Sequence, residues 1–220
     1  MAALNPQQRA AVEAVDGAVL LLAVPGSGKT TVLVTRLGYM VLCCDVPPAQ
    51  ILTMTYTVAA THEMRGRFAA RFGAELAGQM TFRTINGLSA VILQYYSRVY
   101  GRRQPELLTN EGDITRMLTD IWQQVNREFP TESTLKELRT AITYIKNMAL
   151  ADEKIEGLET DLANLPELYR RYQAALKRAG QMDYDDQMVF ALQILRAAPP
   201  VLAYFQQRYK YFCVDESQDT

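Results

Sequence analysis

The sequence is poor in cysteine and histidine, the residues that most often form disulfide bonds and zinc sites. Its 220 residues include three cysteines and a single histidine. Cys43 and Cys44 are adjacent and Cys213 is far away, so neither a disulfide framework nor a zinc-ligand spacing is present. His62 has no cysteine or second histidine nearby in the sequence, and we expect it to be structural.

An excess of charge of one sign is also missing. Lysine and arginine total 23 against 24 acidic residues, which gives a formal net charge of −1. This excludes a histone-like protein that binds nucleic acid through its overall charge, but it permits a local basic groove. Hydrophobic residues make up 49% of the chain, an ordinary share for a globular protein and too high for wholesale disorder.

Long hydrophobic runs are absent as well. The longest apolar run covers residues 18–24, whereas a membrane-spanning helix needs roughly 20 apolar residues. The first residues lack the basic and apolar regions of a signal peptide. We therefore expect a soluble, cytoplasmic protein with no membrane partner.

Short β-like runs alternate with helical patterns at both ends of the sequence. The run at 18–24 is continuously apolar, which is typical of a strand buried on both faces of a parallel sheet. Further strands are expected at 51–56, 79–84 and 209–214, and helices at about 29–42, 59–72, 88–99 and 186–195. This alternation indicates an α/β domain with a parallel sheet.

The middle of the sequence, from about residue 110 to 180, has helical periodicity and no strand pattern. Apolar residues recur at helical spacing in three stretches, around 114–125, 135–149 and 165–176. Three such amphipathic helices can bury their apolar faces against one another. We therefore expect an all-helical subdomain, residues 101–182, inserted into an α/β domain formed by residues 1–100 and 183–220.

A glycine-rich loop follows the first apolar run and reads Ala23-Val24-Pro25-Gly26-Ser27-Gly28-Lys29-Thr30. Between a strand and a helix, such a loop turns backbone N–H groups toward phosphate oxygens, and the start of the helix adds its positive dipole end. Lys29 would reach the β- and γ-phosphates, and the Thr30 hydroxyl would bind Mg²⁺. Ala23 stands where the first glycine is usual, and the alternative is a glycine-rich turn with a chance lysine. The predicted nucleotide-binding residues of the loop are Pro25, Gly26, Ser27, Gly28, Lys29, Thr30 and Thr31.

Two acidic residues, Asp215 and Glu216, follow the last apolar run of the sequence. They would lie at the carboxyl end of a strand, where α/β proteins build their sites. Asp215 can hold Mg²⁺, and Glu216 can orient and deprotonate an attacking water. Together with the glycine-rich loop, they predict a P-loop NTPase.

Several segments, taken in order, resemble the N-terminal motifs of UvrD/Rep/PcrA-like superfamily 1 DNA helicases. They are Leu4-Asn5-Pro6-Gln7-Gln8, the glycine-rich loop, residues 53–57, Thr81-Phe82, residues 182–186 and residues 214–220. The resemblance implies a RecA-like fold, ATP and Mg²⁺ as cofactors, and ATP-dependent unwinding of DNA in the 3′-to-5′ direction. It also implies single-stranded or partly duplex DNA as the partner.

The same resemblance implies roles for individual residues. Gln8 would read the adenine edge, and Gln218 would sense the γ-phosphate and complete a catalytic set with Lys29 and Glu216. Tyr56 would stack on a DNA base. Thr57 and Arg83 would complete the DNA contacts; Arg83 replaces the usual histidine, and its cation can meet a phosphate.

Other positions depart from the family pattern. Val58 stands where an asparagine is usual, which removes one polar DNA contact. Thr31 replaces an arginine that is common beside the nucleotide, and Ser217 replaces an aromatic residue. These departures affect the expected binding of DNA and its coupling to ATP, and they leave the expected ATP chemistry intact.

Arginine and tyrosine are interleaved in one further stretch of the sequence. Arg98, Arg102 and Arg103 surround Tyr95, Tyr96 and Tyr100. This combination suits a single-stranded backbone with stacked bases, and the alternative is an ordinary solvated helix face.

The family resemblance also places a further strand, after residue 220, between the P-loop strand and the Asp-Glu strand. It implies a second RecA-like domain in cis that supplies an arginine to the ATP site. We therefore expect these 220 residues to be the N-terminal part of a helicase and to be inactive alone. Two alternatives stay open, a non-catalytic ATP- or DNA-binding module and the helicase part of a nuclease-helicase subunit.

Overall fold

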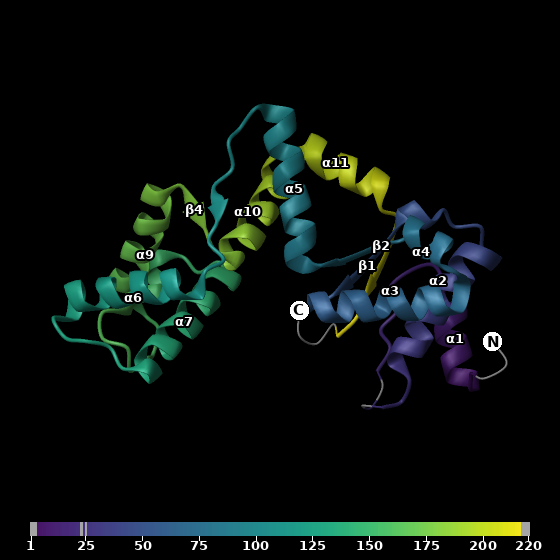
Figure 1. The fold of residues 1–220 in the computed structure, drawn as a ribbon, viewed down its shortest axis with the longest axis horizontal. Helices are drawn as coiled ribbons and strands as arrows, with labels where there is room; N and C mark the ends of the chain where they lie inside the picture. Colours follow the sequence, from purple (N-terminus) through teal and green to yellow (C-terminus); the bar gives the residue numbers. More distant parts are fainter. Residues whose placement is uncertain (1–3, 23, 25, 217–220) are drawn as a thin grey trace. The chain divides into compact units, whose positions relative to one another are not determined.

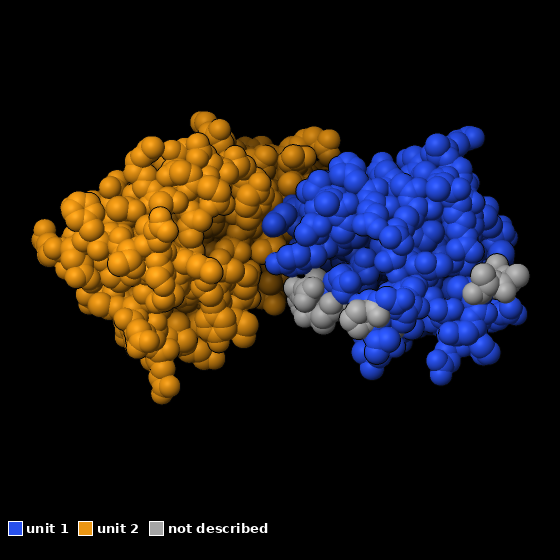
Figure 2. All heavy atoms as spheres, turned by 60° about the horizontal axis from the view of Figure 1, so that its bottom comes forward, with its two compact units in different colours: residues 1–88, 202–220 blue, residues 89–201 orange. Residues whose placement is uncertain are grey.

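The computed structural model of the protein describes residues 4–22, 24 and 26–216. The chain forms two compact units, one of Met1–Leu88 with Leu202–Thr220 and one of Ser89–Val201 (Figure 2). Both borders fall inside helices, α5 (Ile85–Tyr100) and α11 (Pro199–Arg208). The borders that the sequence predicts, at 100/101 and 182/183, therefore lie within the second unit.

The first unit is built on a parallel sheet with the strand order β2-β1-β5 (Figure 1). The strands are β1 (Ile51–Thr55), β2 (Thr81–Thr84) and β5 (Tyr211–Val214). Thr53 in the central strand lies opposite Phe82 on one side and Cys213 on the other. The α/β class predicted from the sequence is confirmed, and all three strands begin or end within two residues of the predicted positions.

Helices cover this sheet, and two of them, α1 and α2, contain residues of the predicted site. They are α1 (Pro6–Glu13), α2 (Lys29–Cys43), α3 (Val58–Phe72) and α4 (Ala74–Gln79), with a short 3-10 turn at Pro48–Gln50. Phe68 of α3 is fully buried, with its ring centroid 6.0 Å from that of Phe82 in β2. Gly38 of α2 lies so close to Phe72 that an added Cβ would be 2.1 Å from its ring. The small residue thus lets α2, the helix that begins at Lys29, pack directly on α3.

The prediction of a buried strand at 18–24 is wrong for the residues that the structure describes there, 18–22 and 24. They form no strand, and Leu20 and Leu22 are 71% and 82% exposed. A strand needs neighbours for its backbone hydrogen bonds, and within the described residues β5 is paired only with β1. An apolar run without such a neighbour forms no strand and stays exposed. The further strand that the sequence places between this run and β5 stays a prediction.

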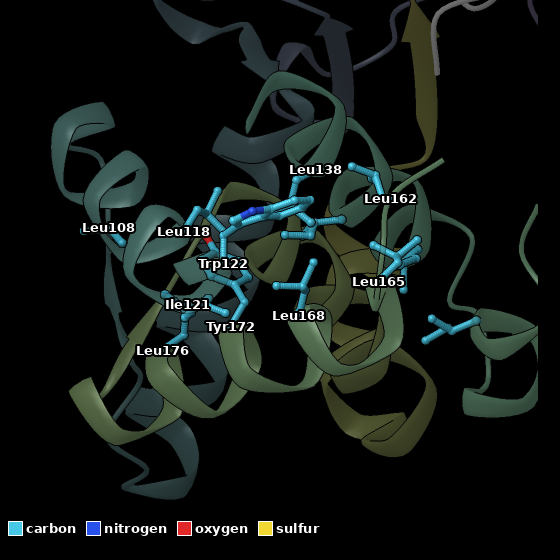
Figure 3. Packing of buried hydrophobic residues seen from close by; sticks show 13 residues of the cluster. Leu108, Leu118, Ile121, Trp122, Leu138, Leu162, Leu165, Leu168, Tyr172 and Leu176 are labelled. Carbon is cyan, nitrogen blue, oxygen red and sulfur yellow. The ribbon is translucent and has the colours of Figure 1, made fainter. Parts of the chain in front are cut away.

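The second unit is a helical bundle with its own core. Its helices are α6 (Glu111–Asn126), α7 (Glu132–Asn147), α8 (Asp152–Glu156), α9 (Leu165–Ala179) and α10 (Tyr184–Ala197), beside most of α5. Figure 3 shows Trp122 of α6, Leu138 of α7 and Leu168 of α9 meeting in this core. All three side chains are at most 5% exposed. The three amphipathic stretches of the sequence therefore pack together as predicted.

Two short parallel strands, of two residues each, pair beside the helices of the second unit. β3 (Glu106–Leu107) pairs with β4 (Gln181–Met182), and Leu108 N donates to Met182 O at 2.8 Å. The sequence does not predict this pair, because two residues are too few to show an alternating pattern.

A buried charged cluster joins α7, α9 and α10 within the second unit. Lys146 Nζ lies 2.6 Å from Asp183 Oδ2 and 2.9 Å from Asp186 Oδ1, and the Tyr172 hydroxyl donates to Asp183 at 3.0 Å. Asp183 and Asp186 also form a reciprocal capping box at the start of α10. The acidic motif at residues 182–186 therefore has a structural role, capping one helix and binding a buried lysine of another.

No single helix among the described residues is long and apolar enough to cross a bilayer. Only α10 and α11 taken together, across a sharp bend, reach that length and apolar content.

Candidate nucleotide-binding site

The predicted phosphate-binding loop leads directly into α2. Gly26 and Gly28 have φ values of 79° and 89°, in the left-handed region that favours glycine. Ser27 N donates to Val24 O at 3.2 Å, which closes the turn. Gly28 precedes α2 without a side-chain cap, so the first N–H groups of this 15-residue helix are open to an anion.

A buried hydroxyl in this loop fits a phosphate ligand. Ser27 Oγ is inaccessible to solvent and has no hydrogen-bond partner among the described residues. Buried polar atoms are normally satisfied, and an unsatisfied one in a native site calls for an explanation. A phosphate oxygen in the loop would accept its hydrogen bond, so the residues present fit the nucleotide that the sequence predicts.

Gln8 contacts this loop from α1. Asn5 caps the helix by accepting from Gln8 N at 2.8 Å, while Gln8 Oε1 accepts from Asn5 N at 3.0 Å. The other end of the same amide, Gln8 Nε2, donates to Ser27 O at 3.1 Å. The capping box thus fixes the side chain that resemblance assigns to adenine, and holds it against the phosphate loop.

Arg36 of α2 anchors the opposite end of α1, a role that the sequence does not predict. Its Nη1 donates to Ala11 O at 2.8 Å and also to Ala14 O, and its Nη2 donates to Val15 O at 3.2 Å. These carbonyls belong to the last turn of α1 and the residues after it, where a helix supplies no N–H donors of its own. The available signal was a single charged residue in the apolar interior of α2.

The lysine of the loop and the acid after β5 meet in space. Lys29 Nζ lies 3.3 Å from Glu216 Oε2, and both side chains are half-buried. Asp215 N donates to Met54 O at 2.9 Å, which extends the pairing of β5 with β1 and fixes the start of the acidic pair. Glu216 adopts a left-handed backbone with φ 51°, and its N–H donates to Asp215 Oδ1 at 3.2 Å.

The electrostatics at Asp215 suit a cation. Burial raises the pKa of the Asp215 carboxyl, and the charge of Glu216 raises it further, while Lys29 opposes the rise. A divalent cation would favour the ionised form and offset this cost. The described residues contain no group of three or more histidine, cysteine or acidic side chains that could hold a metal alone. Mg²⁺ is usually bound through one or two protein oxygens together with substrate phosphates, which Asp215 and the half-buried Thr30 can provide.

The predicted DNA-binding residues lie at the carboxyl ends of β1 and β2. Tyr56 directly follows β1 and is 62% exposed. Arg83 of β2 is exposed and lies opposite Met54 in the strand register. The Thr57 hydroxyl accepts from Ala60 N at 3.1 Å and caps α3. Thr57 therefore has a structural role at the start of this helix.

The contacts therefore bring Gln8, Ser27 and Gly28 together at one end of the site, and Lys29, Asp215 and Glu216 at the other. Thr31 is exposed on the first turn of α2. Pro25 and Gln218, which the sequence also predicts as site residues, lie outside the described residues.

Comparisons with known proteins show the family of the chain. Residues 4–220 match the family described as the UvrD/REP helicase N-terminal domain. The chain is 31% identical to the ATP-dependent DNA helicase PcrA of Leuconostoc citreum over 99% of its own length and 29% of the relative's. It is 32% identical to the ATP-dependent DNA helicase UvrD1 of Mycobacterium leprae, again over 99% of the chain but 28% of the relative. The ATP-dependent DNA helicase PcrA of Staphylococcus aureus is 30% identical over 99% of the chain and 30% of the relative.

The chain thus spans less than a third of the length of these relatives. The match covers the phosphate-binding loop, the Asp215–Glu216 pair and the whole helical unit between β2 and β5. This chain belongs to the UvrD/REP helicase N-terminal domain family.

Proposed function

We propose that this chain is the ATP-binding and single-stranded-DNA-contacting part of an ATP-dependent DNA helicase. The observation that carries the proposal is the Lys29–Glu216 contact, which brings a P-loop lysine and a strand-end carboxylate to one place. The relatives named above are ATP-dependent DNA helicases that are more than three times as long as the matched region. Unwinding therefore belongs to a longer protein with a second RecA-like domain.

The residues of the site have distinct roles in ATP hydrolysis. The open N–H groups of α2 and the Lys29 ammonium bind the phosphates, and Ser27 Oγ donates a further hydrogen bond. Thr30 and Asp215 would hold Mg²⁺, and this ion would supply positive charge to offset that of the nucleotide phosphates. Glu216 orients a water molecule and accepts its proton at a carboxylate oxygen. The water oxygen bonds to the γ-phosphorus as the bond to the ADP oxygen breaks.

Gln8 gives the site its preference for adenine. A side-chain amide offers two N–H donors and a carbonyl oxygen with two lone pairs, so it can keep its bonds to Asn5 and Ser27 while pairing with a base edge. Adenine presents a donor at N6 and an acceptor at N7, which an amide can meet together. ATP is then favoured over GTP.

The DNA contacts lie at the carboxyl ends of the strands. Tyr56 is exposed enough to stack on a base, and Arg83 can meet a phosphate. Tyr56 directly follows β1 and Arg83 belongs to β2, and β1 is paired with β5, the strand that leads to Asp215. DNA binding and ATP chemistry therefore share one sheet. The family resemblance implies 3′-to-5′ unwinding, and the sequence features described above favour a cytoplasmic location.

The test is ATP hydrolysis by the longer protein, with and without oligo-dT. DNA-stimulated turnover that Glu216→Gln abolishes, and that Glu75→Gln leaves unchanged, is the expected result. Glu75 is a suitable control because it is an exposed acid of the same unit, on α4. Turnover that oligo-dT does not change would contradict the proposal. Hydrolysis by the 220 residues alone would show that the second domain is dispensable.

A further inference from the structure

A cavity of about 330 Å³ lies within the second unit, whereas the residues of the ATP site belong to the first. It is formed by the last turns of α5, the segment 102–105 and the last turns of α10. Its apolar walls include Leu93, Phe190 and Ile194, and its polar lining includes Tyr96 and Gln193. All of these residues belong to one compact unit, so the cavity does not depend on how the two units are placed.

Two arginines belong to the lining of this cavity. Arg102 and Arg103 line it and are exposed, and Arg98 and Arg196 belong to the final turns of the two helices. The ion pairs found among the described residues do not involve Arg102 or Arg103. The chain has no net positive charge as a whole, so a local group of cations beside an apolar cavity indicates an anionic partner.

The arginine segment is fixed at both ends. Gly101, with φ 61°, reverses the chain after α5, and Arg102 N donates to Ser97 O at 3.1 Å. The Ser97 hydroxyl donates back to Arg102 O. Glu106 N donates to Gly180 O at 2.8 Å where β3 meets β4. The backbone that carries Arg102 and Arg103 is thus held beside the cavity before any partner binds, which lowers the entropy cost of binding.

The lining is suited to a flat aromatic ring with polar edges. Tyr96 and Tyr100 already form a ring pair with centroids 4.8 Å apart, and Phe190 adds an apolar surface. The side-chain amides of Gln104 and Gln193 can each donate and accept, so they can pair with any base edge. The volume is at the small end of the range for ligand sites, which fits one base better than a dinucleotide.

We propose that this cavity is a DNA subsite that receives one base of single-stranded DNA, with Arg102 and Arg103 on the flanking phosphates. The inference rests on the proposed function, which makes single-stranded DNA the partner. The base is bound by ring stacking and adaptable amides, so the subsite tolerates every base. It gives the interleaved arginines and tyrosines of the sequence a role separate from Tyr56.

The first experiment measures binding of fluorescent oligo-dT to the longer protein by anisotropy at several salt concentrations. The double variant Arg102→Ala, Arg103→Ala loses two phosphate contacts, so the slope of log affinity against log salt becomes shallower by about 1.4. Ala197→Trp, which fills the cavity from α10, weakens binding roughly 5- to 100-fold with the slope unchanged. Arg116→Ala with Arg170→Ala is the matched control, because both arginines are exposed in the same unit and neither lines the cavity.

The second experiment is photocrosslinking of an oligonucleotide that contains 4-thiothymidine. Crosslinks to the peptides that carry Tyr96 or residues 102–105, lost in Ala197→Trp, support the subsite. The melting temperatures of all variants are compared to show that each variant is folded. If Ala197→Trp does not fold, Gln193→Ala takes its place, because it truncates an exposed side chain.

Three results would refute the DNA subsite, and they differ in whether the proposed function is refuted as well. If the cavity variants bind DNA normally while Tyr56→Ala weakens binding, the subsite is refuted and the proposed function stands. If an acidic, aromatic peptide binds the cavity and oligo-dT does not compete with it, the cavity is a peptide site. If oligo-dT neither binds the unaltered protein nor stimulates its ATP hydrolysis, the proposed function fails and the subsite fails with it.

Discussion

Lys29 and Glu216 are separated by 187 positions in the sequence, and their side chains meet at 3.3 Å. The lysine begins α2 and the glutamate follows β5, so the contact lies at the carboxyl end of β5. The two side chains are 30% and 42% exposed, and such a pair contributes at most about 1 kcal/mol to stability. Its importance is therefore chemical, because it sets a phosphate-binding cation beside a carboxylate that can accept a proton.

Glu216→Gln should separate binding of ATP from its hydrolysis. The amide keeps the size of the side chain but accepts no proton from water, and loss of a general base typically lowers a rate by roughly 10²–10⁴. We expect single-turnover hydrolysis in the longer protein to fall by that factor, while a fluorescent ATP analogue binds about as well as before. An equal loss of binding and hydrolysis would instead assign Glu216 to nucleotide affinity.

Asp215→Asn should stabilise the protein at neutral pH while it removes Mg²⁺-dependent ATP binding. Burial and Glu216 raise the pKa of Asp215, so folding favours the protonated carboxyl. The stability from this proton is fully present below the ordinary pKa of aspartate and is lost as pH rises through the raised pKa. The neutral asparagine avoids that loss.

The measurement is the melting temperature of both proteins across pH, without Mg²⁺. We expect the variant to melt higher at pH 7 and the difference to vanish in acid, where Asp215 is protonated in both states. A lower melting temperature at pH 7 would mean that the Asp215 carboxylate has a favourable partner that outweighs its burial.

Tyr56→Ala should weaken binding of single-stranded DNA without unfolding the protein. The side chain is 62% exposed, so little packing is lost, whereas stacking of one base contributes roughly 1–3 kcal/mol. Anisotropy with oligo-dT should show an affinity loss of about 5- to 100-fold that is the same at low and high salt. The control is Tyr144→Ala, another exposed tyrosine, on α7. Unchanged affinity would remove Tyr56 from the DNA site.

The sequence predicts those parts of the structure whose signal is local. The stripes of α6, α7 and α9 repeat at helical spacing, and the glycines at 26 and 28 have the backbone conformation that a tight loop needs. β1 and β5 are also predicted as strands from their local residue types, whereas their pairing with each other depends on segments far apart in the sequence. Periodicity and turn chemistry are properties of a few adjacent residues, so no distant partner has to be known.

Features that depend on distant partners are not predicted. The run at 18–24 has the composition of a strand, but its state depends on a neighbouring strand that composition does not specify. Arg36 and Lys146 each satisfy groups on other helices, and nothing within their own helices indicates which groups. α1 carried a local signal that was missed, since Asn5 followed by Pro6 is a typical helix start.

Arg36→Lys should loosen α1 and with it the preference for adenine. A lysine ammonium cannot reproduce the planar fork that reaches Ala11, Ala14 and Val15 together. We expect a loss of about 2 kcal/mol in the free energy of unfolding, and a smaller ratio of ATP to GTP affinity. Arg9→Lys is the control, because Arg9 is exposed on the same helix. A stability loss with an unchanged affinity ratio would limit Arg36 to a structural role.

Lys146→Met should strongly destabilise the helical unit, and acid should partly reverse the effect. The Lys146 side chain is 2% exposed, and its ammonium binds two buried carboxylates, Asp183 and Asp186. Methionine has a similar volume but leaves both acids without their cation, and breaking a buried pair in this way costs about 3–5 kcal/mol. Burial already raises the pKa of Asp186, and Lys146 is the main group that opposes the rise.

Without that lysine the Asp186 carboxyl should take up a proton at a higher pH, and protonation removes the unfavourable buried charge. The measurement is urea unfolding of Lys146→Met and of Lys136→Met, which replaces an exposed lysine on the same helix. We expect the gap between the two variants to be large at pH 7 and to narrow as pH falls toward 5. A gap that does not change with pH would mean that lost packing, and not unpaired charge, causes the destabilisation.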